Sequence, residues 1–151
     1  MPIVGFNLTN IQAQKLKNID SLKKNEQIKI ESKLGITDVN EEKLPTGKTK
    51  TDGLRFDFEY SLKYQPEIGN ININGFMYYM DDPKIIKDIT EKWKREKNIP
   101  MDIKAQLLNT VVLKASIKAL QLGQEINLPP HMPFPSLKPS TKKSSNEEYI
   151  G

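Results

Sequence analysis

The sequence has no cysteine and a single histidine, His131, in 151 residues. Without cysteine there is no disulfide bridge, no thiol nucleophile and no thiolate metal site. One histidine is too few for the usual zinc sites, which take several histidine or cysteine ligands. We therefore expect no metal ion and no other cofactor.

Long apolar runs are also missing. No stretch approaches the roughly 18 apolar residues that a membrane-crossing helix needs. The first residues, Met1 to Gly5, have neither the basic start nor the apolar core of a secretory signal. We therefore expect a cytoplasmic protein without membrane insertion.

What remains is the composition of an ordinary folded domain, with 36% hydrophobic and 28% charged residues. The net charge of +4 and the pI of about 9.1 permit contact with RNA or acidic surfaces without requiring it. The length fits one domain. We assign it to residues 1–137 and interpret residues 138–151 as a flexible polar tail.

Alternation of apolar and polar residues predicts four strands. The first covers Ile3 to Ala13, with a phase slip at Asn10-Ile11 that indicates a bulge. The others cover Gln27 to Ser32, Leu54 to Tyr64 and Asn70 to Met80. The second half of the last strand is apolar on both faces, so we expect something to cover its second side.

The connections differ in character. Residues 38–53 are charged, rich in threonine, and without a period, which predicts a polar loop. Within them Gly47-Lys48-Thr49 is similar to the end of a phosphate-binding loop. The glycine that this motif needs five residues earlier is Glu42 here, so we expect a surface loop. The stretch Gln65 to Gly69 predicts a tight hairpin turn.

Two helices are expected after the strands. The first begins with Asp82 as N-cap and Pro83 at its first position, and it ends near Lys97-Asn98. The second runs from Met101 to Leu122, with Gly123 as the residue that ends it. The expected fold class is therefore α+β, a four-stranded antiparallel sheet followed by two helices.

Catalytic groups are not evident. Asp57 and Glu59 lie on the polar face of a predicted strand, where solvent reaches them, and Asp82 is expected to cap a helix. No nucleophile and base pair is indicated, so we predict that the protein is not an enzyme.

Basic side chains cluster around the first predicted helix. They alternate with Asp88, Glu91 and Glu96 at spacings that stabilise a solvated helix surface. The alternative is a surface that contacts phosphates in a ribosome-associated or RNA-bound structural protein. The residues in question are Lys84, Lys87, Lys92, Lys94, Arg95 and Lys97.

The segment from Leu128 to Phe134 is apolar and rich in proline, which favours an extended backbone that cannot pair fully in a sheet. Its side chains either cover the edge of the core or line a groove for an extended apolar peptide, and both readings stay open. We expect Trp93 to pack its helix onto the sheet and His131 to be an exposed loop residue.

The order of elements resembles the SecB-type export chaperones, most closely the SecB-like proteins of archaea. The matching stretches lie within residues 3–137, nearly the whole ordered chain. They are Phe6-Asn7-Leu8-Thr9-Asn10-Ile11, Phe56-Asp57-Phe58-Glu59-Tyr60, Ile71-Asn72-Ile73-Asn74-Gly75-Phe76-Met77 and Leu128-Pro129-Pro130-His131-Met132-Pro133-Phe134-Pro135.

The resemblance implies an ATP-independent holdase that binds unfolded or extended polypeptides in apolar grooves and takes part in protein transport. It implies a homo-oligomer, a dimer or tetramer assembled through the first strand and the long helix. The bacterial members carry an acidic surface for the export motor, from which this basic chain departs. By position, the side chains that would line the grooves are Phe76, Tyr78, Met80, Trp93, Met132 and Phe134.

Overall fold

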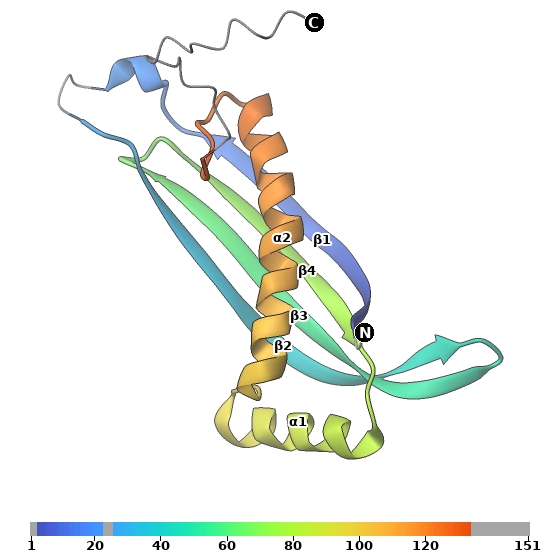
Figure 1. Ribbon diagram of the computed structural model, residues 1–151. Coiled ribbons are helices and arrows are strands. Elements are labelled where there is room, and N and C mark those ends of the chain that lie inside the picture. The colour runs from blue at the N-terminus through green and yellow to red at the C-terminus, as the bar shows by residue number, and fades with distance from the viewer. Residues whose placement is uncertain (1–2, 23–25, 134–151) are drawn as a thin grey trace, which may run out of the picture.

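The computed structural model describes residues 3–22 and 26–133. They form a four-stranded antiparallel sheet followed by two helices, which confirms the predicted architecture (Figure 1). The strands are β1 (Ile3–Lys15), β2 (Lys29–Thr46), β3 (Thr49–Gln65) and β4 (Gly69–Tyr79). A 3-10 turn, η1 (Ile19–Ser21), follows β1, and the helices are α1 (Pro83–Glu96) and α2 (Met101–Glu125).

The strand order is β1-β4-β3-β2, so β1 and β2 form the two edges. Alternation along β3 and β4 turns one row of side chains toward the helices, and we call this side of the sheet the helix face. The opposite side is the open face. The buried row on the helix face comprises Leu54, Phe56, Phe58, Tyr60, Leu62, Tyr64, Ile71, Ile73, Met77 and Tyr79.

The prediction of a polar loop at residues 38–53 is wrong. These residues extend β2 and β3 into a long hairpin, paired in register from Asp38↔Asp57 to Thr46↔Thr49. Gly47 adopts the positive φ of 67° that the turn at its tip requires. The hairpin projects past the end of β4, where alternation is weak because little of the core lies on either side (Figure 1).

The bulge predicted in the first strand is confirmed. The register of β1 against β4 shifts between Leu8 and Asn10, so Thr9 is an extra residue. A second shift lies between Ile3 and Gly5. Both shifts bend this edge strand and interrupt its regular pairing.

Helix α1 has the predicted bounds and buries Ile86, Ile89 and Trp93 against the sheet. Asp82 is the N-cap residue and Pro83 begins the helix, as predicted, but the Asp82 side chain makes no capping hydrogen bond. Its backbone carbonyl instead accepts from the amide of Ile86 at 3.0 Å. Lys97 ends the helix in the left-handed conformation.

Helix α2 continues past its predicted end. Gly123 is a buried helical residue packed near Ile71 and Leu128, and Asn127 takes the left-handed role instead, with φ of 57°. The amide of Leu128 then bonds the carbonyl of Gly123 at 2.8 Å, which closes the helix end. None of the helices in residues 3–22 and 26–133 is long and apolar enough to cross a membrane.

Candidate functional site: an apolar groove between α2 and β2

Helix α2 crosses the strands at an angle, so it covers the middle of the sheet and diverges from the first half of β2 (Figure 1). The gap between them is a groove of about 270 Å³, which we call the α2/β2 groove. Its walls come from two strands, the helix and the segment after it. They are Ile30, Ser32 and Leu34 of β2, Tyr60 and Leu62 of β3, Val112 and Ser116 of α2, and His131 and Met132.

The order of residues on each element explains why the groove is uncharged and largely apolar. On β2 the alternation turns Ile30, Ser32 and Leu34 toward the helix face. On α2, Val112 and Ser116 are one turn apart and flank the buried Ala115. Tyr60 and Ser116 meet through their hydroxyl oxygens at 3.2 Å, which ties the floor to the helix. No residue that lines the groove carries a full charge at neutral pH.

The segment after α2 closes one end of the groove. The Tyr64 hydroxyl donates to the carbonyl oxygen of Pro129 at 2.9 Å, and Leu128 is buried. The Tyr64 hydrogen bond holds this segment against β3, where His131 contacts Tyr60. The prolines at 129, 130 and 133 lack amide donors, so the segment lies on the sheet without pairing as a strand.

His131 is not the exposed loop residue that was expected. It is half-buried, and its ring meets Tyr60 edge-on with the centroids 6.3 Å apart. Both ring nitrogens are buried without a hydrogen-bond partner among the described residues. Burial lowers the pKa of His131 below its ordinary value of 6.5.

The six side chains suggested as groove lining do not come together. Phe76 and Tyr78 lie on the open face, where the guanidinium carbon of Arg55 is 3.9 Å from the centroid of the Phe76 ring. The Tyr78 hydroxyl donates to Oε1 of Glu42 at 3.3 Å. Side chains of β2 and β3 thus contact the second side of β4 and leave it partly exposed, and both helices lie on the other face.

The remaining four are more widely separated. Trp93 lies on the buried side of α1, and the Lys97 ammonium is 5.3 Å from the centroid of its ring. Met80 is half-buried just after β4 ends. Met132 lines the α2/β2 groove. Phe134 lies outside the described residues.

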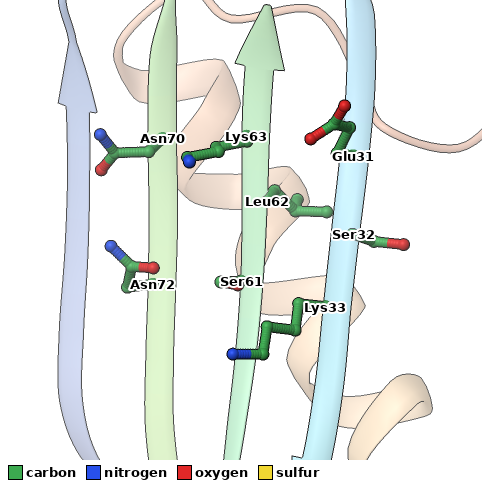
Figure 2. Close-up of a pocket in the computed structure, with 8 residues that line it drawn as sticks. All are labelled: Glu31, Ser32, Lys33, Ser61, Leu62, Lys63, Asn70 and Asn72. Atoms are coloured by element: carbon green, nitrogen blue, oxygen red, sulfur yellow. The ribbon is translucent and has the colours of Figure 1, made fainter.

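The open face is polar. Figure 2 shows a hollow on it, bordered by polar side chains of β2, β3 and β4 such as Lys33, Lys63 and Asn72, with the helix behind the strands. Its cations have acidic neighbours. The Lys33 ammonium is 3.1 Å from Glu59, and the Arg55 guanidinium is 3.0 Å from Asp57. Paired charges of this kind disfavour a phosphate-binding surface.

The basic residues of the first helix are arranged in the same mixed way. Of the six, Lys92 is half-buried and the others are exposed. Lys94, Arg95 and Lys97 lie at the end of the helix. On the surface of α1 they alternate with Asp88 and Glu91, and Arg95 lies 3.5 Å from Glu96. This arrangement is typical of a solvated helix.

A second apolar surface follows the outer side of α2, away from the sheet. Leu113 is 67% exposed and Ile117 is 54% exposed, one helical turn apart. Ile117 also borders a hollow of about 520 Å³, together with Leu120, Leu128 and Pro130. We call Leu113, Ile117 and Leu120 the outer stripe of α2.

The groove itself was not predicted from the sequence. Alternation in the second strand and the apolar stripe of the second helix each predicted one apolar face. Neither pattern showed that the two elements border the same groove. What was missing was the crossing of α2 over the strands, which decides that Val112 and Ile30 border one opening. The lack of charge on the helix-facing row of β2 was the available signal.

No protein-family model matches the chain, and no curated protein matches its sequence. A solved structure that is similar is the SecB-like chaperone of Mycobacterium tuberculosis in complex with a ChAD peptide from the HigA1 antitoxin. The sequences are 10% identical over 91% of each chain, with a TM-score of 0.49. This neighbour is bacterial, and it lends no support to the archaeal affinity suggested by the sequence.

Proposed function

We propose that this protein is a cytosolic, ATP-independent holdase that binds extended apolar segments of unfolded polypeptides, antitoxin-like clients included. The observation that carries the proposal is the α2/β2 groove, which is apolar, uncharged and open along an edge strand. Grooves of this kind accept extended peptides because main-chain contacts hold them and apolar pockets select their side chains.

Two features of the groove favour varied clients. Met132 offers an unbranched, polarisable side chain that adapts to different shapes. Val112 is 39% exposed, so its side chain is available to a client without any rearrangement of the core. A surface that adapts in this way binds many sequences with modest affinity, which suits a holdase.

The experiment is suppression of aggregation of citrate synthase diluted from guanidine, followed by light scattering with and without ATP. Val112→Asp places a carboxylate in the groove. Val4→Asp is the matched control, because Val4 is a 52% exposed valine on β1 outside the groove. Burial of a valine contributes about 1.5 kcal/mol or more, so Val112→Asp should weaken client binding by about tenfold or more.

The wild type and Val4→Asp are expected to suppress scattering equally, whether or not ATP is present. If the wild type fails to suppress it, or if both variants behave alike, the holdase proposal is wrong. A second measurement is a pull-down with the protein from cell lysate. Ribosomal RNA that is retained at low salt and released at high salt would instead favour the RNA-bound structural alternative.

A further inference from the structure

The first half of β2 has the features of a strand that accepts another strand. β2 pairs with β3 along its whole length, and no other strand within residues 3–22 and 26–133 pairs with it. One side of its backbone therefore presents amide and carbonyl groups to an incoming chain. Such an edge is a template for strand addition unless the protein protects it.

Register shifts or a proline interrupt the other edges, and neither occurs in the first half of β2. The second half of β2 begins with a register shift between Ile36 and Asp38 and contains Pro45, which has no amide hydrogen. β1 is interrupted by two register shifts. Residues 29–36 of β2 have regular pairing and no proline. This stretch is the one regular edge that the described residues offer.

The same stretch borders the groove with one face and the solvent with the other. Ile30, Ser32 and Leu34 point to the groove. Lys29, Glu31 and Lys33 alternate with them on the open face and are exposed. A neighbouring strand would therefore meet uncharged side chains on one face and charged ones on the other.

The His131 ring at the end of the groove lacks hydrogen-bond partners among the described residues, although both of its nitrogens are buried. Buried polar atoms in folded proteins are nearly always hydrogen-bonded. A polar side chain of a client that reaches this end of the groove would gain a hydrogen bond to the His131 ring.

We propose that the client adds to residues 29–36 of β2 as a fifth strand, with every second side chain in the α2/β2 groove. The inference rests on the proposed function and narrows its substrate class. The preferred client is an extended segment in which apolar residues alternate with polar ones, and a continuous apolar run is bound less well.

The test uses a ten-residue peptide with leucine at alternate positions and serine, threonine, glutamate and lysine between them. It carries fluorescein, and its binding to the full chain is followed by fluorescence anisotropy. Two further peptides are N-methylated at every second residue, one in each register. An added strand turns only alternate amides toward its neighbour, so the two registers are not equivalent.

One N-methylated peptide is expected to lose about tenfold or more in affinity, because several backbone hydrogen bonds are removed together. The other should bind like the parent peptide. A peptide of the same composition with its leucines consecutive should bind several-fold more weakly, since half of them then face the open side.

Equal binding of both N-methylated peptides, or no binding of the parent peptide, overturns strand addition. Val112→Asp separates this failure from failure of the proposed function. If that variant abolishes binding of all the peptides while both registers bind the wild type equally, the groove binds clients and the strand mode is wrong.

Discussion

Phe6 of β1 and Phe58 of β3 stack with their ring centroids 5.1 Å apart, although β4 runs between their strands. The contact is possible because Gly75 of β4, which pairs with Phe58 on one side and with Leu8 on the other, has no side chain in the way. A Cβ at Gly75 would lie 2.7 Å from Cζ of Phe58 and would also collide with the backbone carbonyl of Asn7. The edge strand β1 and the inner strand β3 are thus in contact across β4, over a missing side chain.

The first prediction follows from this collision. Gly75→Ala should lower the free energy of unfolding by about 1–3 kcal/mol, since the new methyl group overpacks a rigid site. The measurement is urea unfolding followed by circular dichroism. Gly35→Ala is the control, because a Cβ on that strand glycine of β2 meets nothing within 4 Å. Equal midpoints for the two variants would contradict the packing described.

Gly75 also shows where sequence reasoning is sufficient and where it stops. The alternation of Ile71, Ile73 and Met77 predicted the strand and placed these residues on one face, because each residue reports its own side of the strand. The role of the glycine depends on Phe6 and Phe58, which are remote in sequence. Alternation within one strand carries no information about such partners.

The same distinction explains the hairpin and the groove. Residues 38–53 have little apolar patterning, and their strands are specified by pairing with each other across the turn at Gly47. The groove depends on where α2 crosses the sheet, which is set by packing of residues such as Leu107 and Ala115. Neither signal is present in any single stretch of the sequence.

The second prediction concerns pH. His131 is the single histidine, so its imidazole resonances identify it directly in an NMR titration. Desolvation lowers the pKa of His131, so the midpoint should lie below 6.5. The folded state then favours the neutral ring. Its contribution to stability is complete above about pH 6.5 and is lost as the pH falls through the lowered pKa.

His131→Phe provides the control, because it keeps an aromatic ring beside Tyr60 and removes the titration. Urea unfolding between pH 7.5 and 5.5 should show a decline for the wild type that is smaller in the variant. A titration midpoint at or above 6.5, or the same pH dependence in both proteins, would show that the ring is solvated. In that case the segment after α2 does not close the end of the groove.

The third prediction is that the protein is a homo-oligomer that buries the outer stripe of α2. A surface with Leu113 67% exposed and Ile117 54% exposed is typical of an interface. In a two-fold dimer each residue counts twice. If each contributes about 1 kcal/mol, Leu113→Lys with Ile117→Lys should weaken the dimer by roughly a thousandfold.

Sedimentation equilibrium measures this directly, with circular dichroism to verify that the fold is kept. Met101→Lys is the matched control, since Met101 is 75% exposed at the start of the same helix and lies outside the stripe. The wild type and Met101→Lys should sediment as oligomers and the double variant as a 17.3 kDa monomer. A monomeric wild type, or an oligomeric double variant, would show that the stripe is not the interface. Because the stripe and the α2/β2 groove use different residues of α2, the monomeric variant should still bind clients, which separates assembly from client binding.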